Sequence, residues 1–256
     1  MPVSYIQAAD DLLLEIAHCP IVDHCLTPEG AAHPCATIVR NQSGSGCAFQ
    51  EPEPWSGHLD GAVILFVSSN PSWSCEEEYP YSTWSNERVL DYFNNRFGGE
   101  KEWIRDGVRA LKTDGTYWPT GTAFWQAVRN RAWEIVERQP IPAIDYALTE
   151  VVHCKSEREI GVAEALGPCA DRYLRRTLEL SAAQVLVVLG ERAKEAICRI
   201  YQIAWPAAGT VAGPMQMGEQ ERLVTFLPHP NARMRRTFTQ WPDTLKQIQD
   251  FLVPLK

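Results

Sequence analysis

Four short apolar runs stand out along the chain, and polar motifs follow three of them. The runs cover residues 62–67, 146–152, 185–189 and 222–227. Their length and largely apolar character predict β-strands, and the unbroken runs at 62–67 and 185–189 predict strands that are buried on both faces. Helical spacing of apolar residues predicts helices over residues 5–18, 86–97, 124–137, 171–180, 191–201 and 244–252. The alternation predicts an α/β fold: a three-layer αβα sandwich with a central, mostly parallel, four-stranded sheet.

The polar motifs at the ends of these strands point to one shared site. They read SSNPS at residues 68–72, HCKS at 153–156 and PHPNARMRR at 228–236. Carboxyl ends of parallel strands meet at one edge of a sheet, where ligands bind. Asn70 could position a water there, and a neutral His229 could donate a hydrogen bond to a leaving anion. Taken singly, Asn70 can instead be a turn former before Pro71, and His229 a surface residue.

Size and charge narrow the function classes. The 256 residues suffice for one large domain or two small ones. The net charge of −8 counts against a protein that coats nucleic acid non-specifically, but leaves room for a local basic patch. The longest apolar run is far short of the ~20 residues of a membrane span, and residues 1–15 lack the basic cluster of a signal peptide. We expect a soluble, cytoplasmic protein with no membrane partner.

Eight cysteines are many for such a chain. Four of them lie in residues 19–57, a stretch rich in Pro, Gly and Ser that we predict to be irregular and tied down by a bound group. Without a secretion signal, a metal or cluster site is favoured over a disulfide framework, although no pair forms a CxxC. Cys198 lies on an apolar helix face and is predicted to be a core residue.

The motifs resemble those of the uracil-DNA glycosylase superfamily. In that superfamily, the first motif is a strand followed by a short loop with Asn, Asp or Glu before Pro, as at Asn70. The last motif is a strand followed by His-Pro and a loop that enters DNA, as at His229. The FWQA stretch at Phe124 lies between them, as in the mismatch-specific branch. The resemblance runs from about residue 57 to 236. It implies one domain over residues 1–256, with an N-terminal helix and a Cys-rich, cluster-binding segment in residues 1–57, acting on DNA as a monomer.

The cysteines resemble those of the iron-sulfur branch of the same superfamily. There, a strand ending in Val-Val-x-Cys is followed by a second Cys about fifteen residues later, as with Cys154 and Cys169. The resemblance implies a structural 4Fe-4S cluster held by four thiolates. For the other two ligands we favour Cys19 and Cys35. Cys25 and Cys47 remain candidates because the family's close N-terminal pair is absent here, and buried hydrophobic roles are the alternative for all of them.

The family's base-reading position carries Glu150 here, where uracil-specific members have Asn. A carboxylate accepts hydrogen bonds, which suits the exocyclic amine of cytosine. We therefore expect a preference for a modified cytosine, such as glucosylated hydroxymethylcytosine of phage DNA, and a role in antiviral defence. Uracil excision in repair is the alternative. Glu150 could also face elsewhere or pair with Arg158.

Further site residues follow from the same resemblance. Ser69 and Tyr81 are assigned to the base pocket, where an aromatic ring stacks on the flipped base; core packing is the alternative for Tyr81. In the loop after His229, arginines can bind phosphates while Met wedges into the base stack. These DNA-binding candidates are Asn231, Arg233, Met234, Arg235 and Arg236. A solvated basic turn is the alternative.

The resemblance implies a monofunctional DNA glycosylase. His229 would stabilise the departing base and Asn70 would hold the attacking water, because an amide is a poor base. We expect no lysine at the site to form a Schiff base, and hence no lyase activity. Two rivals remain: a non-catalytic nucleic-acid-binding module, and a zinc hydrolase that uses His153 and Cys154.

Overall fold

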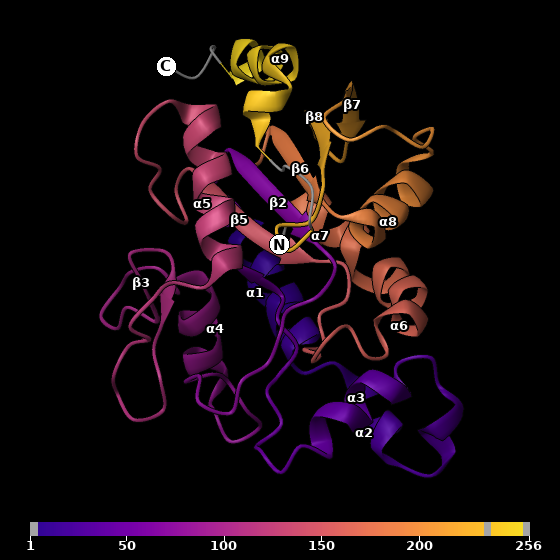
Figure 1. Ribbon diagram of the computed structural model, residues 1–256. Coiled ribbons are helices and arrows are strands. Elements are labelled where there is room, and N and C mark those ends of the chain that lie inside the picture. Colours follow the sequence, from indigo (N-terminus) through magenta and orange to yellow (C-terminus); the bar gives the residue numbers. More distant parts are fainter. Residues whose placement is uncertain (1–4, 233–236, 253–256) are drawn as a thin grey trace.

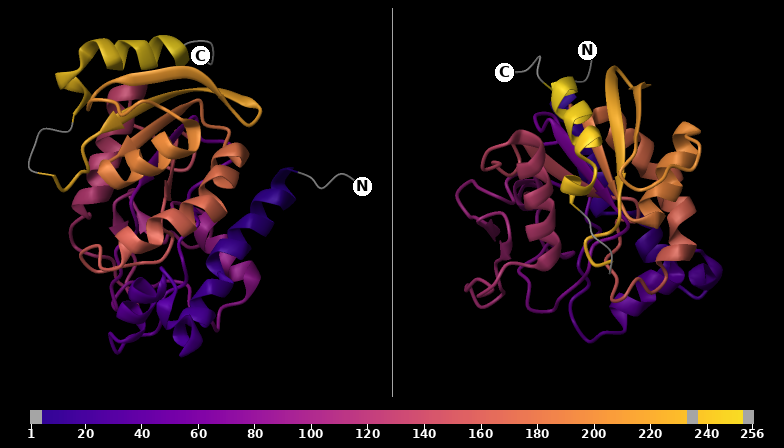
Figure 2. Two further views of the ribbon diagram at one scale, coloured as in Figure 1. Left: turned by 90° about the vertical axis from the view of Figure 1, so that its right-hand side faces the viewer. Right: turned by 45° about the horizontal axis from the view of Figure 1, so that its top comes forward.

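The predicted strands form the centre of a six-stranded sheet that lies between two layers of helices (Figures 1 and 2). The computed structural model describes residues 5–232 and 237–252. The sheet order is β1-β5-β2-β6-β8-β7. Its strands are β1 (Trp55–Ser56), β2 (Ile64–Ser68), β5 (Tyr146–Glu150), β6 (Val185–Leu189), β7 (Val211–Met217) and β8 (Gln220–Leu227), and a separate hairpin contains β3 (Ile104–Arg105) and β4 (Arg109–Ala110).

The helices surround this sheet. They are α1 (Tyr5–Ala17), α2 (Pro20–Leu26), α3 (Ala36–Ser43), α4 (Asn86–Asn94), α5 (Ala123–Val136), α6 (Val162–Cys169), α7 (Arg175–Leu180), α8 (Glu191–Tyr201) and α9 (Pro242–Leu252). A π-helical turn at Ala170–Leu174 joins α6 to α7, so the helix expected at 171–180 begins earlier, at Val162. None of the helices in the described residues is long and apolar enough to span a membrane.

Alternate residues of each central strand pack into different cores. On β2, Ile64 and Phe66 face the layer of α5 and α9, while Leu65 and Val67 face the layer that contains α1, α7 and α8. All five residues of β2 are buried. This two-sided burial explains the unbroken apolar runs and confirms the predicted αβα sandwich.

Two short antiparallel strands extend the expected four-stranded sheet. The central strands β5, β2, β6 and β8 are parallel, as predicted. At the edges, β1 pairs with β5 and β7 pairs with β8, both antiparallel. Edge strands tolerate Pro and exposed residues, and β7 contains Gly213-Pro214 and is mostly accessible to solvent. Its sequence is therefore more typical of a loop than of a buried strand.

The N-terminal cysteine-rich segment is helical where an irregular stretch is predicted. Pro20 occupies the first turn of α2, a position that its fixed φ favours. Gly161, with φ of +77°, lets the start of α6 approach α3: a Cβ at this position would lie 2.4 Å from the backbone nitrogen of Ile38. Packing of α2 on α3, and of α3 on the start of α6, thus orders this segment, which lies below α6 in Figure 1.

One pair of cysteines forms a disulfide, contrary to the expectation of free thiols. Cys47 and Cys75 are bonded and join the N-terminal segment to the loop after β2. Cys47 is therefore not available as a cluster ligand. Cys198 is a buried core residue of α8, as predicted.

Candidate functional site

A cavity of about 410 Å³ lies at the carboxyl ends of the parallel strands. Asn70 follows β2, Glu150 ends β5 and His229 follows β8, and all three line this cavity. Asn231 lines it too. The shared site expected from the strand-end motifs is therefore present. Aromatic side chains form much of the remaining wall: Trp73, Trp118, Phe124 and Trp125.

The loop after β2 orients the amide of Asn70. Its Nδ2 donates a hydrogen bond to the carbonyl oxygen of Pro71 at 2.9 Å. The hydroxyl of Ser69 lies 3.3 Å from both Oδ1 of Asn70 and Oε1 of Glu159. An amide oxygen has two lone pairs, so Oδ1 can accept a further hydrogen bond from a water or substrate. Ser69 itself is buried and does not line the cavity.

His229 is held in one orientation by its neighbours. Its ring stacks on Phe124, with ring centroids 5.7 Å apart and planes 24° from parallel. The backbone N–H of Asn231 donates to Nδ1 at 3.2 Å, so the proton of a neutral ring lies on Nε2. Gly190, with φ of +88°, gives the ring room, because a Cβ there would lie 3.0 Å from Cβ of His229.

Glu150 lies buried in the cavity wall. It pairs in register with Ser68 across β5 and β2, and the Ser68 hydroxyl donates to its Oε1 at 3.4 Å. Its other oxygen, Oε2, is buried and has no hydrogen-bond partner within the described part of the chain. Burial, followed by the negative charge of Glu53, raises the pKa of Glu150 well above its ordinary value. The predicted alternative of a pair with Arg158 is wrong, since that exposed side chain pairs with Glu157.

Four charged side chains form a buried network in the same cavity. Arg96, which is 2% exposed, contacts Glu53 at 2.6 Å and Glu77 at 3.0 Å. Lys155 contacts Glu77 at 3.1 Å. Burial alone would raise the pKa of Glu53, but the charges of Arg96 and Lys155 hold it below its ordinary value. Glu53 is thus an anion, and Tyr79 donates a further hydrogen bond to it at 2.9 Å.

Lys155 corrects the expectation that no lysine lies at the site. It is 1% exposed and lines the cavity. Burial lowers its pKa, while the carboxylates of Glu77 and Glu53 favour its charged form. Its Nζ also lies 3.3 Å from the ring centroid of Tyr79. The net effect is a lowered pKa, while the contacts with Glu77 and Tyr79 favour the ammonium form of the amine.

The sequence-based prediction missed several residues that line this cavity. Glu53, Arg96 and Lys155 come from separate segments, and no local pattern joins them. Phe124 belongs to the FWQA stretch but carried no assigned role. Tyr81 is 38% exposed and does not line the cavity; its ring packs against Trp84. Arg233, Met234, Arg235 and Arg236 lie outside the described residues.

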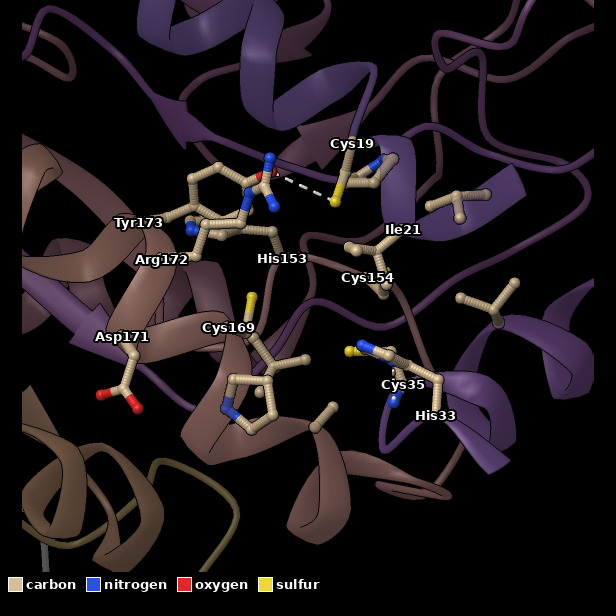
Figure 3. A pocket seen from close by; sticks show the side chains of 16 residues that line it. Cys19, Ile21, His33, Cys35, His153, Cys154, Cys169, Asp171, Arg172 and Tyr173 are labelled. Atoms are coloured by element: carbon tan, nitrogen blue, oxygen red, sulfur yellow. Dashed lines mark hydrogen bonds between the residues drawn. The ribbon is translucent and has the colours of Figure 1, made fainter. Parts of the chain in front are cut away.

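A second cavity, of about 330 Å³, brings the favoured cysteines together. Cys19, Cys35, Cys154 and Cys169 line it, and Figure 3 shows the thiols of Cys19, Cys35 and Cys169 pointing toward a common space. Tyr173 donates a hydrogen bond to Sγ of Cys19 at 3.2 Å. Cys25 is buried beside His33 and does not line the cavity.

The pKa values of three of the thiols that line this second cavity are raised. Burial raises the pKa of Cys35 to about 12. The pKa of Cys154 is raised too, by burial and then by the closeness of the other titratable thiols Cys169, Cys19 and Cys35. Nε2 of His153, another lining residue, is buried and has no hydrogen-bond partner within residues 5–232 and 237–252. In the same ranges, no group of three or more His, Cys, Asp or Glu side chains is placed to hold a metal ion.

One family matches the chain. The model of the uracil DNA glycosylase superfamily matches residues 54–253, most of the chain. The matched range contains Asn70, Glu150 and His229, together with Cys154 and Cys169; Cys19 and Cys35 precede it. No curated protein matches the chain.

Proposed function

Because the chain belongs to the uracil DNA glycosylase superfamily, we propose that it is a monofunctional DNA glycosylase. It flips a nucleotide out of DNA and hydrolyses the N-glycosidic bond of that nucleotide's base. The observation that carries this proposal is the meeting of Asn70, Glu150 and His229 in one cavity at the carboxyl ends of the parallel strands. DNA is the substrate, and the protein acts as a monomer.

His229 stabilises the leaving base. When the glycosidic bond breaks, its electron pair moves onto the base and an oxocarbenium-like sugar remains. A neutral imidazole with its proton on Nε2 can donate a hydrogen bond to the base carbonyl as negative charge develops there. The stack on Phe124 and the hydrogen bond from Asn231 hold the donor in place before the reaction.

Asn70 positions the water that attacks the sugar. Its Nδ2 is engaged with Pro71, which orients Oδ1 as an acceptor for water. The water adds to C1′ and releases its proton to solvent or to the departing base. An amide is a poor base, so holding the water in line is its contribution. Lys155 is engaged by Glu77, which supports hydrolysis without a Schiff base.

The base pocket is roomy and aromatic. Phe124 and three tryptophans in the wall supply π surfaces on which a flipped base can stack. Tyr81, which packs outside this cavity, is a weaker candidate for that role. A cavity of about 410 Å³ exceeds the needs of a bare pyrimidine, and together with Glu150 it supports a modified cytosine as the target. Such bases occur in phage DNA, so a role in antiviral defence follows; uracil excision in repair is the second candidate.

The loop after His229 supplies the contact with DNA. Asn231, in this loop, lines the cavity, and the run of Arg233, Met234, Arg235 and Arg236 continues the loop in sequence. Arginines bind phosphates, and an apolar side chain can wedge between bases. These residues concentrate positive charge on a protein whose net charge is −8.

A structural 4Fe-4S cluster fits the second cavity. Four thiols from separate segments line one space instead of converging on a single point, which suits a group larger than one ion. Cys19, Cys35, Cys154 and Cys169 would hold it, and the unpartnered Nε2 of His153 could accept a hydrogen bond or ligate there. A bound cluster would keep these thiols deprotonated and tie α2 and α3 to the sheet. The arrangement does not favour the rival zinc centre.

The cluster proposal makes a direct prediction. Anaerobically purified protein should be brown and contain iron and sulfide, and Cys154→Ser should lose most of both. Cys198→Ser is the matched control, because that thiol is also buried but lies away from the cavity. Iron analysis and the visible spectrum measure the result. A Cys154→Ser protein with the full iron content of Cys198→Ser would contradict the ligand assignment.

The glycosylase proposal is tested with oligonucleotides that carry uracil, cytosine, hydroxymethylcytosine or glucosylated hydroxymethylcytosine. Alkali cleaves DNA at any abasic site that the protein leaves. We expect strand breaks on one of these substrates, and these breaks should appear only after alkali treatment. Asn70→Ala should produce no such breaks. Borohydride should trap no covalent adduct between the protein and DNA. Binding without breaks on any substrate would favour the binding-module hypothesis. A trapped adduct that is lost in Lys155→Met would identify Lys155 as a nucleophile.

A further inference from the structure

The buried charges around Glu150 already balance one another. Glu53 and Glu77 supply two negative charges, and Arg96 and Lys155 supply two positive charges. Each cation contacts at least one of these carboxylates at 3.1 Å or less. An ionised Glu150, which is buried, would add a third negative charge to this group, and buried charges without a counter-ion are strongly disfavoured.

Glu150 has no cation of its own within the described part of the chain. Its one hydrogen-bond partner there is the neutral hydroxyl of Ser68, which donates to Oε1. Oε2 is buried without a partner, in a residue that is 3% exposed and lines the base cavity. Oε2 itself is shielded from solvent, so a base in the cavity would satisfy this oxygen once the carboxyl group of Glu150 rotates toward the cavity.

We propose that Glu150 reads the flipped base as a neutral carboxylic acid, with its proton on Oε2. This inference rests on the proposed glycosylase function and deepens it, because it defines what the pocket presents to the base. Oε1 already accepts from Ser68, so it is the carbonyl-like oxygen and Oε2 carries the hydroxyl. The pocket then offers the base one donor and one acceptor on adjacent atoms.

The charged groups near Glu150 act on its ionisation in both directions. The carboxylate of Glu53, which precedes β1, opposes a second negative charge. Arg96, after α4, and Lys155, after β5, favour ionisation, but both are committed to Glu53 and Glu77. Burial is the largest influence, and with Glu53 it raises the pKa of Glu150 despite the two cations.

A neutral acid changes which bases fit. An ionised carboxylate only accepts hydrogen bonds, so it suits the exocyclic amine of cytosine but repels the N3 lone pair beside it. A carboxylic acid accepts from that amine and donates to N3 at the same time. The substrate class is therefore a base with an amino group next to an unprotonated ring nitrogen, such as cytosine and its 5-substituted derivatives. The 5-position stays free for a substituent.

Glu150→Gln separates the two states of the acid. Gln presents a donor and an acceptor as the neutral acid does, but it cannot ionise. We expect Glu150→Gln to keep base excision within a few-fold of wild type, whereas Glu150→Leu, which removes both hydrogen bonds, should lose about 10- to 100-fold. Wild-type activity should fall as the pH rises through the pKa of Glu150, and Glu150→Gln should lack this fall. Equal losses in Glu150→Gln and Glu150→Leu would overturn the proposal.

A spectroscopic readout does not depend on activity. In protein labelled with ¹³C at the glutamate carboxyl, the resonance missing from Glu150→Gln belongs to Glu150, and its chemical shift reports protonation. We expect a neutral carboxyl at pH 7; an ionised carboxyl there would overturn the inference. A neutral Glu150 in a protein that excises no tested base would uphold the inference about this residue and count against the proposed function instead.

Discussion

Replacing His229 with alanine should lower the rate of base excision by about 10²- to 10³-fold, the range expected when one preorganised donor to a developing anion is removed. The donor is preorganised because Phe124 stacks on the ring and the N–H of Asn231 occupies Nδ1. The loss should appear in the single-turnover rate, with DNA affinity little changed. Single-turnover kinetics with saturating enzyme measure it.

His58→Ala is the matched control for this variant. His58 is exposed and lies before β2, away from the strand ends that carry the site. It should excise bases at the wild-type rate. Equal single-turnover rates of base excision for wild type and His229→Ala would show that the imidazole does not contribute to catalysis.

Replacing Arg96 with methionine should destabilise the fold by about 3–5 kcal/mol, as expected when one partner of a buried ion pair is removed. Arg96 is 2% exposed and bridges Glu53 and Glu77, so its loss leaves the buried carboxylate of Glu53 and the half-buried carboxylate of Glu77 with Lys155 alone. Methionine keeps much of the side-chain volume, which limits the contribution of a cavity. Denaturant unfolding, compared at equal cluster content, gives the free-energy difference.

Arg176→Met provides the control for this measurement. Arg176 also pairs with a carboxylate, that of Glu15 at 2.7 Å, but both side chains are partly exposed. Exposed pairs contribute about 0.2–1 kcal/mol, so the loss should be small. A similar small loss for Arg96→Met would mean that the buried network contributes little to stability.

The position of the site is predictable from the sequence because it follows from topology. Apolar runs predict the parallel strands, and parallel strands bring their carboxyl ends to one edge. This argument groups Asn70 with His229, and both line one cavity. Glu150, which the family resemblance adds to the site, lines the same cavity. The pattern of the family groups Cys154 with Cys169, and these two thiols share the second cavity.

The charge network could not be predicted in this way. Glu53, Glu77, Arg96 and Lys155 are each ordinary charged residues in sequence, and such residues are mostly exposed. Only their tertiary contacts make them a buried, neutral group. Tyr81 failed as a pocket residue for a related reason, because proximity in sequence to Asn70 does not fix the direction of a side chain in a loop.

The helices of the N-terminal segment could not be predicted from the sequence because they are short and their first residues are not typical helix N-caps. Cys19 precedes α2 without a side-chain cap, and Pro20 is typical of a loop unless it is recognised as a first-turn residue. Cys35 stands in the same position before α3. Packing against α6 and against the cysteine cavity stabilises these helices more than their local sequence does.

The release of a free base tests the central claim most directly. The protein is purified anaerobically and incubated with DNA that carries each candidate base, and the low-molecular-weight products are identified by mass spectrometry. The account predicts one intact free base in equal amount to abasic sites, and neither product with Asn70→Ala. Abasic sites or strand breaks without a released base, or base release that Asn70→Ala leaves unchanged, would contradict it.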